Sequence, residues 1–238
     1  MTRHLFSPVQ SRFFFFFVVV LLFPLQGCDS GGGAGPIAAP EGTYSIGFFV
    51  DSPVEGLEYS SITWSGITDA QGGFYYRGDE DLTFHLGDVV IGRIPAMRII
   101  TPVDLGGVAA NTASTVVINI AQFLQSLDID LNPANGITIP QEVRDACEGI
   151  VVDFTQDDLN NDAGVQEMFD RLNDIGIYPE EEIGLIPAEE AQLHLEETII
   201  NIEEEQAAAE EALANMKLQA NIGDPCTYSS VLMIQGQS

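Results

Sequence analysis

Beyond residue 42 the chain first alternates between short apolar runs and turn-forming residues. Gly, Pro, Asp and Ser lie between the runs and are typical of tight turns. In one run apolar and polar residues alternate with period two, as in a strand with one buried face. The pattern predicts about six short strands, at Ile46 to Val50, Ile62 to Ile67, Phe74 to Tyr76, Leu82 to Leu86, Val89 to Ile94 and Met97 to Ile100. We therefore expect an antiparallel β-sandwich over residues 43 to 105.

Residues 106 to 238 have a different period. Apolar residues recur there every three or four positions, as on one face of an α-helix, first over Val117 to Leu127 and again over Val165 to Ile175. Between these two helices, the β-branched run Ile150 to Phe154 predicts a strand. The fold class expected is α+β, with the sandwich followed by an acidic, mainly helical part.

A long helix is expected from Pro187 to about Ala220. Pro in the first turn and Glu189 and Glu190 near the positive end of the helix dipole favour its start. Steps of four and three residues define a heptad-like seam, formed by Leu195, Ile199, Ile202, Gln206, Ala209, Leu213, Met216 and Ala220. Two interpretations are open, because this seam can pack within the monomer or be available to a partner helix.

The N-terminus differs from the rest in composition. Residues 1 to 27 contain two arginines and no acid, and an apolar run from Phe13 to Phe23 follows Arg12. This run is too short to cross a bilayer, which takes about 20 residues, and is typical of a signal peptide. The next segment, Leu25 to Cys28, resembles the lipobox of bacterial lipoproteins, in which the peptide is cleaved before the Cys and the thiol receives a diacylglyceryl group.

The lipobox resemblance implies that Cys28 is lipidated and that acyl chains hold the mature chain on a membrane. The Gly-rich stretch within residues 28 to 42 is expected to be a flexible tether. The expected location is therefore the bacterial cell envelope, as an exported, membrane-anchored lipoprotein. Asp29 directly follows the Cys, and the choice between inner and outer membrane stays open.

A second resemblance concerns the expected sandwich. Pro53 to Tyr59, followed by Gly66 to Tyr76, resembles the transthyretin-like modules called carboxypeptidase regulatory-like or Cna-B-like domains. The resemblance implies that Asp69 and a following Gly form a hairpin turn and that Phe74 enters the core. It also implies a spacer, adhesive or binding unit instead of a catalyst.

The wider stretch resembles uncharacterised, adhesin-like bacterial surface lipoproteins. The segments that carry this resemblance are Gly87 to Gly92, Ile100 to Leu105 and Asn119 to Asp128. The resemblance implies a surface location and no mechanism.

Cysteine usage follows from the lipobox. With Cys28 lipidated, Cys147 and Cys226 remain in an oxidising compartment, and a disulfide between them is expected. It would close a loop of nearly 80 residues and stabilise the fold by roughly 4 kcal/mol. The alternative is two buried thiols. A redox pair or zinc site is not favoured, because neither Cys has a Cys-x-x-Cys spacing or a neighbouring His.

One loop has the start of a calcium-binding pattern. Asp128, Asp130 and Asn132 alternate like the first ligands of an EF-hand loop. Pro133 stands where that loop needs Gly, and Ile139 stands where it needs Glu. Two interpretations are open: a calcium site completed by other oxygens, or a turn that ends the preceding helix.

Charge and composition exclude several classes. The chain has 8 basic and 36 acidic residues, a net charge of −28, and 45% hydrophobic residues. Because residues 1 to 27 hold two of the basic residues and none of the acids, residues 28 to 238 carry −30. Such a surface repels nucleic acid. The apolar content excludes disorder throughout the chain.

Catalysis is not expected. Residues 28 to 238 contain two His and one Lys, and have no Gly-x-Ser-x-Gly, His-Glu-x-x-His or phosphate-binding glycine motif. A hydrolase built on a pair of carboxylates is the alternative.

These features predict a membrane-anchored cell-envelope lipoprotein with a non-catalytic binding or adhesion role. The alternative is a structural or assembly component that oligomerises or docks through the long C-terminal helix. The partners expected are the membrane, through the lipid, and an unknown envelope protein or glycan, besides self-association; nucleic acid is not expected. No cofactor other than calcium is expected.

Overall fold

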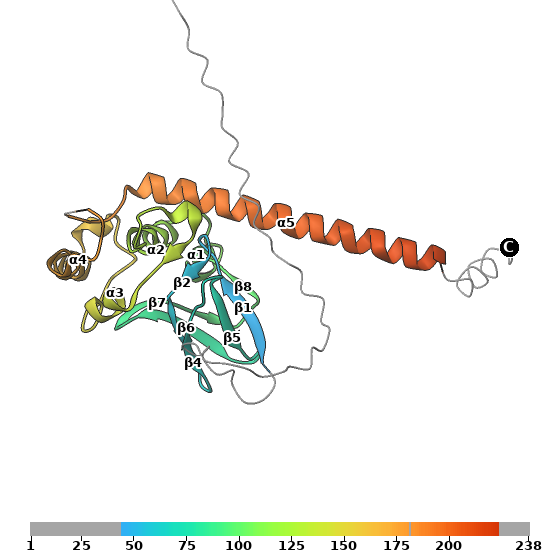
Figure 1. Cartoon of the computed structure of the whole chain (residues 1–238), viewed down its shortest axis with the longest axis horizontal. Coiled ribbons are helices and arrows are strands. Elements are labelled where there is room, and N and C mark those ends of the chain that lie inside the picture. Colours follow the sequence, from blue (N-terminus) through green and yellow to red (C-terminus); the bar gives the residue numbers. More distant parts are fainter. Residues whose placement is uncertain (1–43, 181, 224–238) are drawn as a thin grey trace, which may run out of the picture. The chain divides into compact units, whose positions relative to one another are not determined.

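A computed structural model describes residues 44 to 180 and 182 to 223, with side chains as far as residue 218 (Figure 1). The strands of that part are β1 (Ser45–Phe49), β2 (Val54–Glu55), β3 (Glu58–Ser60), β4 (Ser65–Ile67), β5 (Gly73–Tyr76), β6 (Asp81–Leu86), β7 (Val89–Pro95), β8 (Ile99–Ile100) and β9 (Ile137–Thr138). The α-helices are α1 (Pro102–Leu105), α2 (Thr115–Ser126), α3 (Gln141–Ala146), α4 (Ala163–Ile175) and α5 (Ala188–Gly223), and two short 3-10 helices lie at Pro133–Asn135 and Leu159–Asn161.

The strands form two main sheets and one small one. The larger sheet is antiparallel, in the order β4-β3-β6-β7, and the second has the order β5-β1-β8. In the second sheet β1 is antiparallel to β5 and parallel to β8. The small sheet pairs β2 with β9 in parallel, so that Val54 lies beside Ile137. The fold is thus α+β, with an antiparallel sheet and a long C-terminal helix, as expected.

Aromatic rings join the two main sheets. The ring of Phe84 in β6 lies 4.9 Å from that of Phe49 in β1 and 5.4 Å from that of Phe74 in β5. Tyr59 in β3 lies 5.7 Å from Phe74, and all four side chains are buried. Rings of this size supply much of the apolar area that a small domain must bury.

Asp69 and Gly72 lie in the turn between β4 and β5, as the transthyretin-like resemblance implies. The turn is not a hairpin, because β4 pairs with β3 and β5 pairs with β1 in a different sheet. One carboxylate oxygen of Asp69 accepts hydrogen bonds from the backbone N–H groups of Gln71 (2.9 Å) and Gly73 (2.7 Å). Gly72 has a φ of 74°, and a Cβ there would lie 2.4 Å from the carbonyl oxygen of Phe49. Gly adopts this positive φ without strain and has no Cβ to clash with the carbonyl oxygen. Phe74, the second residue of β5, is buried, as the resemblance implies.

A single cluster of buried side chains continues from the strands into the helices. It contains Phe49 and Leu86 from the sheets, Phe123 from α2 and Leu172 from α4. The pairing of β2 with β9 also crosses residue 105. The strand-rich and the helix-rich parts therefore share one core. The boundary expected between residues 105 and 106 separates two kinds of secondary structure and does not separate two cores.

The strand expected at Ile150 to Phe154 was wrong, because this segment has irregular backbone. The side-chain amide of Asn119 in α2 donates to the carbonyl oxygens of Phe154 (2.9 Å) and Gln156 (2.8 Å). Ile150 and Phe154 are buried, so these side chains serve the core without a neighbouring strand.

Candidate functional site

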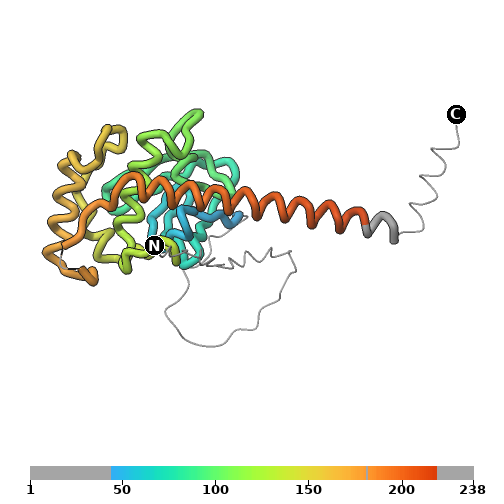
Figure 2. Tube along the Cα trace, turned by 90° about the horizontal axis from the view of Figure 1, so that it is seen from above, coloured from blue at the N-terminus to red at the C-terminus, as the bar shows by residue number. Residues whose placement is uncertain are grey.

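Helix α5 has two parts with different surroundings. Its first part, residues 188 to 202, packs on α2, where Leu195 lies with Val117 and Ala121 in a small apolar cluster. We call residues 203 to 223 the arm. Every side chain described in the arm is exposed, from residue 203 to residue 218. The helix extends there beyond the strands and the other helices (Figures 1 and 2). At 1.5 Å per residue the arm is about 30 Å long.

The arm is acidic and has exposed apolar side chains near its end. It contains five Glu and one Lys. Leu213, Met216 and Leu218 are 48%, 52% and 61% exposed. Ala and Glu, its commonest residues, have high helix propensity, and the packed first part supplies the nucleus from which the helix continues. The arm is thus helical although every side chain described in it is exposed.

The two interpretations of the predicted seam, packing within the monomer and availability to a partner helix, therefore apply to different parts of it. Leu195, Ile199 and Ile202 contact the body of the fold, as expected for packing within the monomer. From Gln206 to Met216 the seam is exposed, which leaves it available to a partner.

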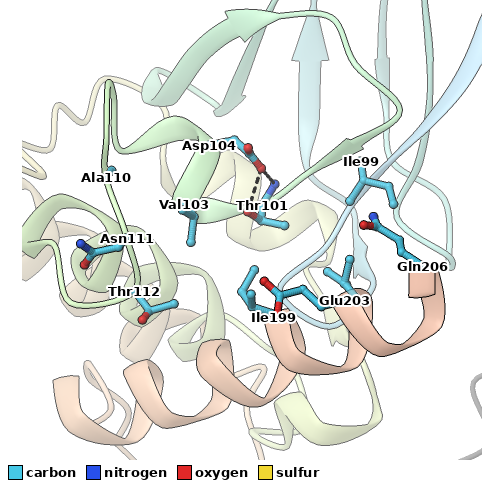
Figure 3. Close-up of a pocket in the computed structure, with 11 residues that line it drawn as sticks. Ile99, Thr101, Val103, Asp104, Ala110, Asn111, Thr112, Ile199, Glu203 and Gln206 are labelled. Atoms are coloured by element: carbon cyan, nitrogen blue, oxygen red, sulfur yellow. Dashed lines mark hydrogen bonds between the residues drawn. The ribbon is translucent and has the colours of Figure 1, made fainter. Parts of the chain in front are cut away.

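A groove of about 390 Å³ lies where α5 leaves the fold (Figure 3). Its walls come from β8 and α1, from the loop before α2, and from α5, and are formed by Ile99, Thr101, Val103, Asp104, Ala110, Asn111, Thr112, Ile199, Ile202, Glu203 and Gln206. Two of these residues are acidic and none is basic. The groove thus suits a group with an apolar part and a positive charge.

Hydrogen bonds hold both walls of this groove. Asp104 Oδ2 accepts from the backbone N–H of Thr101 and from its hydroxyl, both at 2.8 Å. Across the groove, the hydroxyl of Thr112 donates to Glu196 of α5 at 3.2 Å. The bonds of Asp104 hold the start of α1, and the bond from Thr112 joins α5 to the loop before α2.

A buried carboxylate lies beneath the first part of α5. Asp51, in the turn between β1 and β2, has no exposed surface. The side-chain amide of Gln125 in α2 donates to its two oxygens at 3.2 and 3.0 Å, and also to the carbonyl oxygen of Ala191 in α5 at 3.1 Å. Burial raises the pKa of Asp51 to about 7, against the lowering effect of the Gln125 hydrogen bond. The Oε1 atom of Gln125 has no hydrogen-bond partner among the described residues.

The neighbouring residue also contacts α5. Ser52 has a φ of 57°, unusual for a residue with a side chain, and its hydroxyl lies 3.0 Å from Nε2 of His194. Burial lowers the pKa of the His194 imidazole, with Glu197 opposing the shift. Ser and His at this distance resemble a nucleophile and its base, but Asp51 binds Gln125, and neither Ser52 nor His194 lines the groove. The contact joins the β1–β2 turn to α5.

Sequence reasoning missed this junction. Asp51 and Ser52 follow an apolar run and have the residue types of an ordinary turn. His194 lies within the long helix next to the seam residue Leu195, and it is half-buried. A signal for the junction was present in α2, whose apolar face continues through the polar residue Gln125, which is buried.

Of the three cysteines, Cys28 and Cys226 lie outside the described residues. Cys147 follows α3 and is a buried, free thiol, with its Sγ 3.5 Å from the sulfur of Met168. Burial raises its pKa to about 12, and the charge of Glu58 adds to the shift. The burial of Cys147 agrees with the alternative of two buried thiols. The disulfide with Cys226 stays a prediction, because Cys226 lies outside the described residues.

Cys147 is expected to resist alkylation in the folded protein. At pH 8 its thiolate is a minute fraction, and the core excludes the reagent. Peptide mapping by mass spectrometry after iodoacetamide treatment should find Cys147 unmodified in buffer and modified in 8 M urea, the unfolded control. A Cys147–Cys226 disulfide peptide in an unreduced digest would contradict the expectation.

The three residues of the calcium pattern are brought together in one loop. Asp128 accepts from the backbone N–H groups of Asn132 (2.8 Å) and Thr138 (2.9 Å). Asp130 accepts from the same Asn132 N–H (3.0 Å) and from the amide of Asn135 (2.9 Å). Burial is the largest cause that raises the pKa of Asp128 to about 6, and its contact with Asp130 adds to the shift.

All four oxygens of these two carboxylates thus accept hydrogen bonds that shape the loop. No group of three or more His, Cys, Asp or Glu side chains suited to a metal ion occurs within residues 44 to 180 and 182 to 223. Calcium at Asp128, Asp130 and Asn132 stays a proposal. The geometry gives more support to the other interpretation, a turn that ends α2.

Comparisons with protein-family models, curated proteins and solved structures found no match to this chain. Within the described part of the chain, no helix is both long and apolar enough to cross a bilayer.

Proposed function

We propose that this chain is a non-catalytic, membrane-anchored lipoprotein of the bacterial cell envelope, and that the arm of α5 docks it to another envelope protein. The lipobox-like segment that ends at Cys28 supports the anchor and the location. The observation that carries the docking role is the arm itself, with its unbroken series of exposed side chains from residue 203 to residue 218.

The strand-rich part is a transthyretin-like sandwich in this proposal. Two sheets whose facing sides share the ring contacts of Phe49, Phe74 and Phe84 support that assignment. The module would act as a spacer between the tether and the helical part.

The charge and the exposed apolar side chains of the arm support one kind of partner. The arm carries five Glu against one Lys, and Asp104 and Glu203 line the groove at its base. Two arms side by side would repel each other, whereas a basic surface would be attracted. The partner proposed is therefore an envelope protein with a basic groove that also covers Leu213 and Met216.

Substitution of Leu213 and Met216 by Glu is expected to release the protein from this complex. Both side chains are about half exposed, so the change removes apolar contact area from the arm and leaves the core intact. Leu193→Glu is the matched control, because Leu193 is an exposed Leu of the same helix, outside the seam.

The measurement is the native mass of the protein after mild detergent extraction. Wild type and Leu193→Glu should run in a complex with a second protein, and the double variant as the 25.7 kDa chain less its signal peptide. A wild-type monomer, or a complex that persists in the double variant, would overturn docking through the arm. A complex made only of copies of this chain would contradict the basic partner.

A further inference from the structure

A shelf of aromatic side chains lies at one end of the strands, away from the residues that form the groove and the arm. It is formed by Tyr44, Ser61, Thr63, Trp64, Tyr75, Tyr76, Arg77 and Glu80, around a hollow of only about 10 Å³. Four of the eight residues are aromatic, and the other four are polar. The shelf is thus shallow and has both aromatic rings and hydrogen-bonding groups.

The aromatic rings are held in place before any ligand binds. The Tyr44 and Tyr75 rings meet edge to face, with centroids 4.9 Å apart and planes at 84°. The indole N–H of Trp64 donates to the hydroxyl of buried Tyr59 at 3.2 Å, and the backbone N–H of Tyr75 donates to the same oxygen at 3.1 Å. Fixed rings lower the entropy cost of binding.

Glu80 provides a partly used acceptor at this shelf. Hydrogen bonds from Ser61 and Thr63 lower the pKa of its carboxyl, and the charge of Arg77 adds to the shift. Its Oε1 accepts a hydrogen bond from the hydroxyl of Thr63 at 2.7 Å. Its Oε2 is buried and has no hydrogen-bond partner among the residues that the structure describes. A buried carboxylate oxygen without a donor is costly, and a ligand hydroxyl would supply that donor.

We propose that this shelf binds a neutral saccharide, whose C–H face stacks on the rings while a hydroxyl donates to Oε2 of Glu80. A saccharide combines an apolar ring face with many hydroxyl donors, which matches rings next to an unused acceptor. The net charge of −30 on residues 28 to 238 disfavours an anionic polymer. The site is separate from the arm, so it goes beyond the docking role and does not depend on it.

A proline-rich peptide is the other ligand that aromatic surfaces bind. Such peptides present carbonyl oxygens and need donors, typically an indole N–H. Here the indole N–H of Trp64 is already bonded to Tyr59, and the charge of Arg77, the other strong donor of the shelf, already acts on Glu80. Oε2 of Glu80 is an acceptor without a donor among the described residues. The hydrogen-bonding inventory therefore favours the saccharide.

The single Trp of the chain is on the shelf, so its fluorescence reports binding directly. The full chain is titrated with maltohexaose, cellohexaose, chitohexaose and a proline-rich peptide. We expect a saturable change in fluorescence with at least one saccharide and none with the peptide. Glu80→Gln should weaken binding about tenfold, the effect of losing a hydrogen bond to a charged acceptor, and Tyr75→Ala should abolish it.

The docking variant Leu213→Glu/Met216→Glu is the matched control and should bind the saccharide like wild type. Far-ultraviolet circular dichroism of each variant checks that the fold is retained. Any of three results would overturn the proposal: no saturable change with any of the saccharides, equal binding by folded Glu80→Gln, or saturation with the peptide alone.

Discussion

At pH 8 the Asp51→Asn variant is expected to be more stable than wild type by up to about 4 kcal/mol, and at pH 4 the two should be nearly equal. Asp51 is wholly buried, and burial raises its pKa from 3.8 to about 7. An Asn in its place is never charged. Its amide can also donate to Gln125 Oε1, which has no partner within the described part of the chain.

The direction of this pH dependence follows from the difference in proton affinity of Asp51 between the folded and unfolded states. The folded state binds a proton at Asp51 more tightly than the unfolded state does, because the buried side chain must stay neutral. Below about pH 4 both states are protonated, and the Asp51 contribution to stability is fully present. As the pH rises towards 7, the unfolded state ionises and the folded state does not, so stability falls. Above pH 7 the loss is complete.

Urea unfolding at pH 4 and pH 8 measures this difference. Asp79→Asn is the matched control, since Asp79 is exposed and lies in a turn between strands. We expect it to follow wild type at both pH values. An Asp51→Asn protein that is no more stable than wild type at pH 8 would refute the buried-carboxylate argument.

Cys28→Ser is expected to abolish lipidation completely. The thioether to the diacylglyceryl group needs the thiol, and each buried methylene of an acyl chain contributes about 0.8 kcal/mol to membrane binding. Cells grown with an alkyne-tagged fatty acid should label wild type and the Cys226→Ser control equally, and Cys28→Ser not at all. Label on the Cys28→Ser protein, or no label on wild type, would refute the anchor.

Regular helices and the larger strands were predictable, because their pattern is local. The spacing from Val117 to Leu127 and from Val165 to Ile175 locates α2 and α4, and the alternation at Leu82 to Leu86 locates most of β6. The start of α5 was off by one residue, since Pro187 precedes the helix and accepts its first hydrogen bonds.

What the sequence did not predict depends on contacts between distant residues. The pairing of Val54 with Ile137 involves two residues of each strand, too few for a periodic signal. The junction of Asp51 with Gln125 and Ala191 joins three elements, none of which is unusual by itself. Likewise, the heptad spacing of α5 is the same in both parts, and only the position of α2 decides which part is covered.

The most direct test of docking through the arm is photo-crosslinking in the intact cell. A photoreactive amino acid replaces Leu213 in the arm or, as the control, Leu193 in the packed part of α5. We expect a crosslink from position 213 to one envelope protein with a basic surface, and none from position 193. Absence of a crosslink at 213, or the same adducts from both positions, would contradict it.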